Sequence, residues 1–220
     1  MAEPDVETRE RLLNAAAQLF AARGFRDVTI REICGEAGAN VAAVNYHFGD
    51  KVGLYRDVLG KAIETMRSTT EAARQAGAGG TPEQRLRAYI RVFLRRVAGG
   101  GRDHWIHQLM ARELADPTEA LDLITEQVIR PRLAYLGDIV AQMLDRPAGD
   151  EGVLACVLSI QSQCHAAMPS PIARRLFPVG PTGPKALDRL ADHIADFSLG
   201  GIRATSRTDG VHAVQKVRKG

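Results

Sequence analysis

Glycines divide the first fifty residues into short segments that each carry apolar residues at helical spacing. Gly24, Gly38 and Gly49 follow segments whose apolar side chains recur three and four positions apart. Glycine readily ends a helix because it adopts the left-handed backbone conformation at little cost. Along the whole chain, no alternating run of β-branched and aromatic residues lies between turns. The sequence therefore predicts an all-α fold.

Capping residues indicate where the first helices begin. Thr29 and Glu32 have the spacing of a capping box, in which the threonine hydroxyl caps the first turn and the glutamate reaches back. Asn40 can cap a short third helix. The two helices joined at Gly38 have the length and break of a helix-turn-helix. We expect their apolar residues to pack on a first helix at 8–23, these residues being Ile30, Ile33, Val41, Val44 and Phe48.

A long fourth helix is expected to begin near Lys51 and to join two domains. Residues 1–52 would form a three-helix helix-turn-helix domain, and residues 53–202 a helical-bundle domain for effector binding and dimerisation. Pro131 is expected to kink or divide one helix of the bundle. Residues 203–220 hold five Lys or Arg and one Asp without apolar periodicity, so a disordered basic tail is expected there.

Charge alone does not indicate a nucleic-acid ligand. The formal net charge is +3, and residues 1–61 hold 8 Lys or Arg against 9 Asp or Glu. DNA binding is therefore inferred from the local motif. The acidic N-terminus does not resemble a secretory signal, and no apolar run reaches the ~18 residues needed to span a bilayer. Three cysteines do not make a disulfide framework, so we expect a cytoplasmic protein, with no cofactor implied.

In a helix-turn-helix, the second helix enters the major groove and the first lies across the backbone. The second helix here carries small and polar residues, which permit close approach to base edges. We expect base contacts from Asn40, Ala42, Ala43 and Asn45. Phosphate contacts are expected from Thr29, Tyr46, His47 and Lys51. The alternative is an ordinary pair of bundle helices, in which Tyr46 packs and His47 is a surface residue.

Several motifs at fixed spacing resemble the N-terminal domain of TetR/AcrR-type regulators. They are 12–20 (Leu-Leu-Asn-Ala-Ala-Ala-Gln-Leu-Phe), Arg23-Gly24-Phe25, 29–33 (Thr-Ile-Arg-Glu-Ile), Ala37-Gly38-Ala39, and 44–48 (Val-Asn-Tyr-His-Phe) with Lys51, Leu54 and Tyr55. The resemblance implies a homodimer whose repression is relieved by a small ligand, and it implies the same DNA-contacting residues. Many members have Leu and Tyr where this chain has Val44 and Asn45. Residues 104–113, 116–118 and 131–133 are similar to a CecR-like subgroup.

The segment from His104 to Glu113 is the expected wall of an effector pocket, because it carries the single tryptophan among polar residues. Candidate effector contacts are Trp105, Gln108, Arg112, Gln161 and His165. Alternatively, Gln161 and His165 belong to a helix–helix contact, and Arg112 pairs with Glu113 or Asp116. His104 and His107 could ligate a metal, but the sequence offers no identifiable third ligand.

Two apolar helices near 131–144 and 150–168 are the expected dimer interface. Their surplus apolar residues would form a four-helix contact between protomers, these residues being Ile139, Val140, Met143, Val153, Val157 and Ile160. A two-fold dimer predicts a near-palindromic operator. The sequence thus favours a ligand-responsive repressor. The alternatives are a regulator of the same fold controlled by a protein partner or without an effector, and an enzyme, for which no catalytic motif is found.

Overall fold

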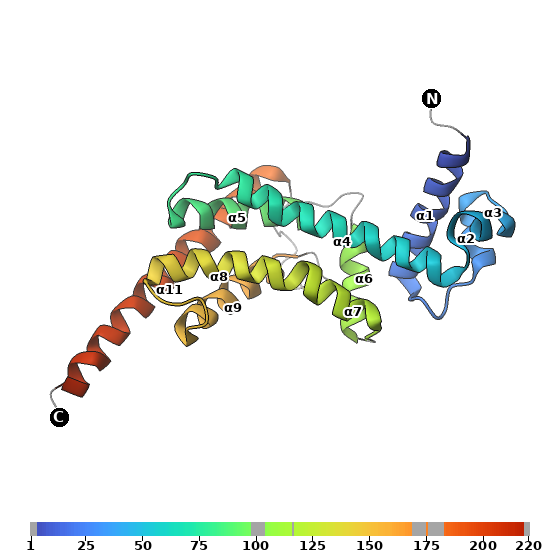
Figure 1. The fold of residues 1–220 in the computed structure, drawn as a ribbon. Coiled ribbons are helices and arrows are strands. Elements are labelled where there is room, and N and C mark those ends of the chain that lie inside the picture. Colours follow the sequence, from blue (N-terminus) through green and yellow to red (C-terminus); the bar gives the residue numbers. More distant parts are fainter. Residues whose placement is uncertain (1–3, 98–103, 116, 169–174, 176–182, 218–220) are drawn as a thin grey trace. The chain divides into compact units, whose positions relative to one another are not determined.

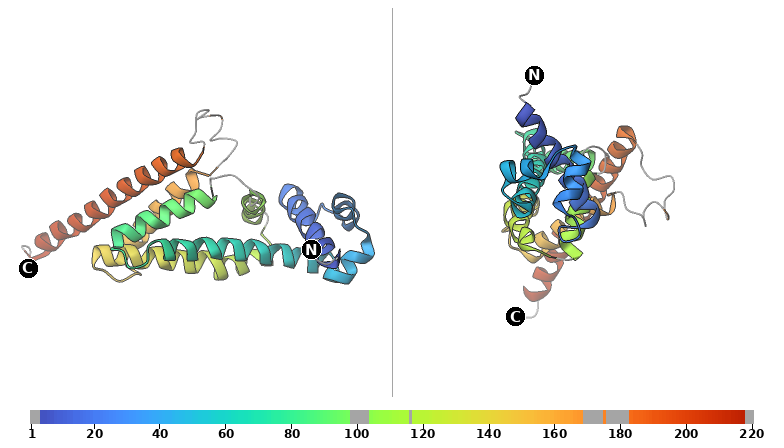
Figure 2. Two further views of the ribbon diagram at one scale, coloured as in Figure 1. Left: turned by 90° about the horizontal axis from the view of Figure 1, so that it is seen from above. Right: turned by 90° about the vertical axis from the view of Figure 1, so that its right-hand side faces the viewer.

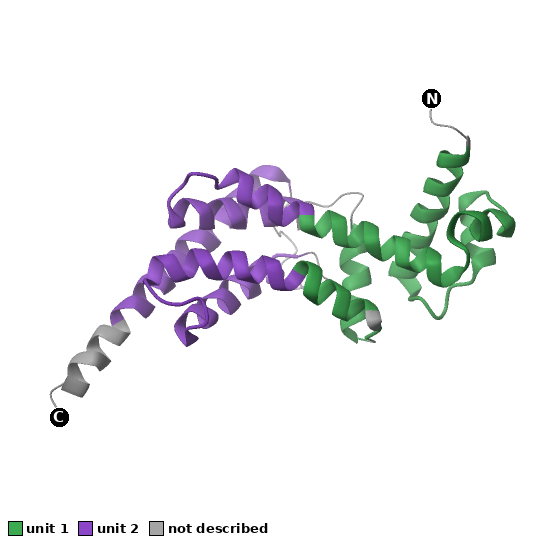
Figure 3. Cartoon of the chain, in the orientation of Figure 1, with its two compact units in different colours: residues 1–67, 101–128 green, residues 68–100, 129–220 purple. Residues whose placement is uncertain are grey.

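The computed structural model describes residues 4–97, 104–115, 117–168, 175 and 183–217, and these are helical with short connections (Figure 1). No strand occurs among these residues, so the all-α prediction is confirmed. The chain divides into two compact units (Figure 3). Unit 1 comprises residues 1–67 and 101–128, and unit 2 comprises residues 68–100 and 129–220. Unit 1 is thus larger than the helix-turn-helix domain expected at 1–52. No described helix is long and apolar enough to cross a membrane.

Unit 1 contains the helix-turn-helix and two helices from the middle of the chain. Its elements are α1 (Pro4–Arg23), α2 (Ile30–Ala37), α3 (Val41–Phe48), the first part of α4 (Lys51–Ala76), α6 (His104–Ala115) and α7 (Glu119–Ile124). Both α2 and α6 pack on α1. Leu12, Phe20 and Leu54 are fully buried, so the apolar stripe of α1 forms the core on which the DNA-binding motif rests.

One residue expected in this core lies outside it. Val44 is fully buried and Ile33 with it, but Val41 is 42% exposed. Val41 is the first residue of α3, and Val44, three positions later, occupies the inward face. The prediction that Val41 packs against the first helix is therefore wrong. The helical spacing was correct, but the first residue of α3 lies on its exposed side and not on the side that packs in the core.

Positive φ angles confirm the predicted helix ends. Gly24, Gly38 and Gly49 have φ values of 89°, 60° and 79°. A fourth glycine, Gly53, is required for a different reason: a Cβ placed there would lie 1.9 Å from the backbone oxygen of Phe48. The start of α4 therefore approaches the end of α3 so closely that a side chain at position 53 would collide with the backbone of α3.

Unit 2 is a bundle of α5 (Pro82–Val97), α8 (Arg130–Leu144), α9 (Glu151–Ala166) and α11 (Pro184–Val217). A π-helical turn at Thr125–Ile129 connects α7 to α8, and the backbone stays helical at both of its ends. Pro131 stands in the first turn of α8, directly after this change of helix type, so the expected interruption of the helix takes the form of a π turn. Helix α11 packs along α5 (Figure 2). Among the described residues, four ion pairs join these helices, namely Arg203–Glu83, Arg87–Asp196, Arg91–Asp192 and Arg95–Asp188.

The apolar residues expected at the dimer interface lie instead in the core of unit 2. Ile139, Val140 and Val153 are fully buried, and Val157 and Ile160 nearly so. Met143 is partly buried against the same core. The choice of contact residues was therefore wrong, because α8 and α9 are covered by α5 and α11 within one chain. The use of these two helices in a dimer stays a prediction. The exposed apolar side chains of unit 2 are others: Leu154 and Leu158 on α9, and Phe197 on α11.

The sequence predicts a disordered tail from residue 203, but the chain is still helical at that position. Helix α11 continues past residue 203, because tertiary contacts hold its next turn. Arg203 donates a hydrogen bond to Glu83 at 2.8 Å, and Thr205 lies 3.7 Å from the Cys156 sulfur. The side chains after residue 207 lie outside the described residues.

Candidate DNA-binding interface

The outer face of α3 carries most of the residues predicted to contact bases. Asn40, Ala42 and Asn45 are exposed, and Ala43 is half-buried. The Oδ1 atom of Asn40 accepts a hydrogen bond of 2.9 Å from the Ala43 amide, so this side chain caps the helix. Its amide NH₂ group has the donors that an adenine or a phosphate would accept. Val41 joins this face, and sequence reasoning missed it by assigning it to the core.

Tyr46 and His47 are neighbours in the chain with opposite environments. The Tyr46 side chain is 76% exposed, so its hydroxyl is available to a phosphate. His47 packs between Tyr46 and Phe48, its side chain is only 7% exposed, and its Nε2 atom lies 3.4 Å from Asp5. His47 can reach a phosphate only by leaving this contact. The structure therefore favours Tyr46 of the two as a phosphate ligand.

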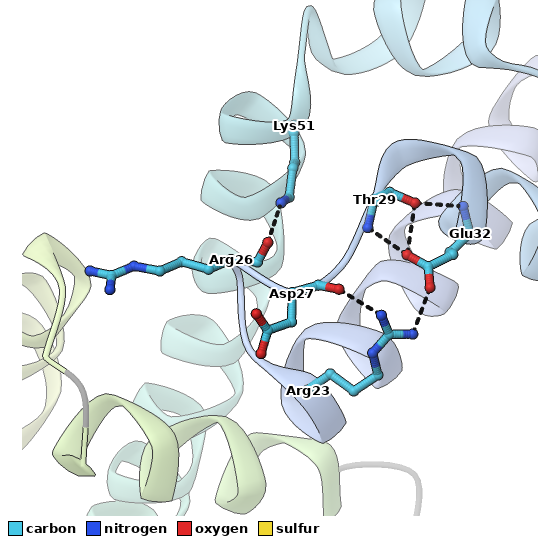
Figure 4. A network of polar contacts seen from close by, with 6 residues as sticks. All are labelled: Arg23, Arg26, Asp27, Thr29, Glu32 and Lys51. Atoms are coloured by element: carbon cyan, nitrogen blue, oxygen red, sulfur yellow. Dashed lines mark hydrogen bonds and ion pairs between the residues drawn. The ribbon is translucent and has the colours of Figure 1, made fainter.

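The capping box predicted at the start of α2 is present and extends into a network (Figure 4). The Thr29 amide and hydroxyl donate hydrogen bonds of 2.8 and 2.7 Å to Oε2 of Glu32, while the Thr29 hydroxyl accepts from the Glu32 amide at 3.3 Å. Arg23 donates to Oε1 of Glu32 at 2.8 Å and to the Asp27 carbonyl at 2.6 Å. A phosphate approaching Thr29 therefore meets a hydroxyl that is already engaged.

These contacts also fix the charge of Glu32. The hydrogen bond from Arg23, followed by those from Thr29, lowers the pKa of Glu32 to about 2. Glu32 is consequently ionised at any pH at which DNA is bound. Its negative charge lies at the N-terminus of α2, where the helix dipole favours an anion.

Lys51, at the start of α4, extends over the loop between α1 and α2 (Figure 4). Its Nζ atom donates a hydrogen bond of 3.4 Å to the Arg26 carbonyl and lies 4.5 Å from the centre of the Phe25 ring. These contacts orient the ammonium group without neutralising it.

The five predicted effector contacts fall into two groups. Trp105, Gln108 and Arg112 lie on α6 in unit 1, and Gln161 and His165 lie on α9 in unit 2. Trp105 is buried and Gln108 is exposed. In place of an ion pair with Glu113, Arg112 donates hydrogen bonds to the Ala21 and Ala22 carbonyls at the end of α1.

Arg112 also borders a cavity of about 340 Å³ in unit 1. Its walls include Phe20, Phe25, Tyr55 and Leu109. In unit 2, Gln161 is hydrogen-bonded to Tyr89 and His165. No group of three or more potential metal ligands occurs among the described residues.

A three-helix motif with an exposed polar helix at its surface is the arrangement found in helix-turn-helix DNA-binding domains. Residues 12–58 match the bacterial regulatory proteins of the tetR family, and residues 82–202 match the C-terminal domain of the HTH-type transcriptional dual regulator CecR. The chain belongs to the TetR family and has a CecR-type C-terminal domain. The members it resembles are transcription regulators and not enzymes.

Individual relatives agree with this assignment. The chain is 31% identical over 158 residues to the dual regulator CecR of Shigella flexneri, covering 66% of this chain and 68% of the relative. It is 41% identical over 56 residues to the repressor BepR of Brucella suis, covering 26% and 27% of the two chains. A TetR-family regulator from Streptomyces coelicolor has the same fold, with a TM-score of 0.62, 24% identity, and coverage of 91% and 97%.

Proposed function

We propose that this protein is a cytoplasmic, ligand-responsive repressor that binds a near-palindromic operator as a homodimer and leaves it when a small molecule binds. The observation that carries the proposal is the outer face of α3. Asn45, Ala42 and the NH₂ group of Asn40 are open to solvent, beside the exposed Tyr46. Amides and methyl groups are the chemistry that reads adenine and thymine in the major groove.

Unit 2 supports a homodimer through an apolar surface on α9 and α11. Leu158 and Phe197 are 64% and 66% exposed, and Leu154 lies one turn from Leu158 on the same face. Gly200 and Gly201 of α11 are exposed, and a Cβ at either would meet nothing within 4 Å. Large apolar side chains beside small residues permit two copies to interdigitate.

Contacts within unit 1 supply a route by which α6 can influence the DNA-binding motif. Arg112 binds the last carbonyls of α1, and Glu113 accepts a hydrogen bond from Tyr55 of α4. A ligand that favours another position of α6 would therefore change its contacts with α1 and with α4. These two helices flank the helix-turn-helix in the chain. The coupling requires the ligand to bind the two arrangements with different affinity.

The first experiment is selection from a random duplex library, followed by fluorescence anisotropy on the selected site and light scattering in solution. We expect two equal half-sites in inverted orientation and a mass of twice 23.9 kDa. Leu158→Glu should give a monomer, whereas Leu114→Glu, at a 70% exposed leucine of unit 1, should leave the dimer intact. A selected site without inverted symmetry, or a wild-type monomer on that site, would contradict the proposal.

A further inference from the structure

Arg132 of α8 is a half-buried arginine for which the described residues provide no counter-ion. Its Nε atom is buried and has no hydrogen-bond partner. Burial lowers the pKa of the Arg132 guanidinium, and Tyr89 and Cys164 act weakly in the opposite direction. Burial raises the pKa of both of these groups, so neither is an anion that could pair with Arg132. Among the described residues, no carboxylate forms an ion pair with it. The Nε side of this guanidinium is therefore removed from water with no anion or acceptor beside it, which has a desolvation cost.

The neighbours of Arg132 form an aromatic and hydrogen-bonding surface inside unit 2. The guanidinium carbon lies 5.4 Å from the centre of the buried Phe93 ring, a cation–π contact that offsets part of the desolvation cost. Tyr89 stacks on Phe93 at 6.0 Å and donates a hydrogen bond of 2.8 Å to Gln161. Gln161 in turn lies 3.2 Å from Nδ1 of His165.

His165 connects this cluster to the surface. Its ring packs edge-on against Phe93 at 5.8 Å, yet the residue is exposed. Burial and the positive charge of Arg132 both lower the pKa of His165, so the imidazole is held neutral beside the cation. The cluster therefore presents one unpaired positive charge, aromatic faces and neutral hydrogen-bonding groups, with an exposed residue at one side.

We propose that Arg132 recognises the anionic group of the effector, and that the effector is an apolar organic acid. This inference rests on the proposed function, in which a small molecule releases the protein from its operator, and it adds a ligand site in unit 2. A carboxylate, sulfonate or phenolate oxygen would supply the anion that the guanidinium lacks among the described residues, and Phe93 and Tyr89 would contact the apolar part. Gln161 and His165, predicted from sequence as effector contacts, would supply neutral hydrogen bonds beside the charge.

The test is isothermal titration calorimetry, which measures the dissociation constants of two ligands of similar shape, 2-naphthoate and 2-naphthamide, with the full-length protein. We expect the acid to bind at least about tenfold more tightly than the amide, since a hydrogen bond to a charged group is worth more than a neutral one. Arg132→Met should abolish that preference, and Arg132→Lys should retain part of it. Arg85→Met is the matched control, because it also removes one arginine that makes a cation–π contact, in this case with Tyr135. It should leave the preference for the acid unchanged.

Thermal unfolding separates a binding role from a structural one. Because Arg132 has no anionic partner among the described residues, Arg132→Met should keep or raise the melting temperature of the protein without ligand. In the wild type, 2-naphthoate should raise the melting temperature. Equal affinities for acid and amide, no binding of the acid, or an undiminished preference in Arg132→Met would each overturn the inference.

Fluorescence anisotropy with the selected operator measures how each ligand changes the affinity for DNA. This measurement tests the inference and the proposed function separately. If the acid binds through Arg132 but leaves operator affinity unchanged, the inference stands and release by this ligand fails. If 2-naphthamide releases the operator as well as 2-naphthoate does, the release mechanism stands and the inference fails.

Discussion

The Tyr55 hydroxyl donates a 2.5 Å hydrogen bond to Oε1 of Glu113, although the two residues are 58 positions apart. Glu113 is only 3% exposed, and its other oxygen accepts from the amide and hydroxyl of Thr118 at 3.1 and 2.8 Å. Burial, followed by this hydrogen bond to Glu113, raises the pKa of Tyr55, so the phenol remains protonated and can donate. The pair joins α4, which follows the recognition helix, to α6.

Tyr55→Phe should destabilise the protein by about 1–3 kcal/mol, because a buried carboxylate oxygen would lose its partner. Urea denaturation measures the change. Tyr46→Phe removes a hydroxyl from a side chain that is 76% exposed and should change stability by less than about 0.5 kcal/mol. Equal stabilities of Tyr55→Phe and wild type would show that the hydrogen bond contributes nothing net.

Gly53→Ala should disrupt the junction of α3 and α4, because the added Cβ would lie 1.9 Å from the Phe48 carbonyl oxygen. We expect a loss of at least about 2 kcal/mol and a loss of operator binding. Gly60→Ala in the same helix meets no atom within 4 Å and should stabilise the protein by about 0.5–1 kcal/mol. Thermal unfolding of the two variants compares them directly, and similar melting temperatures would refute the close approach.

Asn40 has a capping role and a predicted base contact, and two substitutions separate them. Asn40→Ser keeps an N-cap oxygen, whereas Asn40→Ala removes it at a cost of about 1 kcal/mol. If Asn40 also reads a base, both variants should lose preference at one operator position in a repeat selection. If Asn40→Ala changes the stability but neither variant changes the sequence preference, then Asn40 acts only as a helix cap.

Lys51→Ala should weaken binding to all duplexes alike and reduce the salt dependence of binding by about one unit of log–log slope, as expected for one lost phosphate contact. Tyr46→Phe should weaken binding with little change in slope, because a hydroxyl releases no counter-ion. Anisotropy at several salt concentrations, on the selected site and a scrambled duplex, measures both effects. A Lys51→Ala variant with altered sequence preference and an unchanged slope would argue for a base contact instead.

Features set by neighbours in the chain were predictable from sequence. The capping box of Thr29 and Glu32, the Asn40 cap and the positive-φ glycines Gly24 and Gly38 all depend on interactions within a few residues. Side-chain type and spacing therefore sufficed for them. The exposed polar face of α3 was also predictable, because small and polar residues there could not form a core.

Features that depend on which helices meet were decided by the tertiary structure. The sequence could not show that Arg112 bonds to the end of α1, 91 positions away, rather than to its neighbour Glu113. Nor could it separate the apolar residues of α9 that pack in the core, such as Val157, from those that stay exposed, such as Leu158. Periodicity gives the faces of a helix, but burial follows from how many partners cover it, and the bundle alone determines that number.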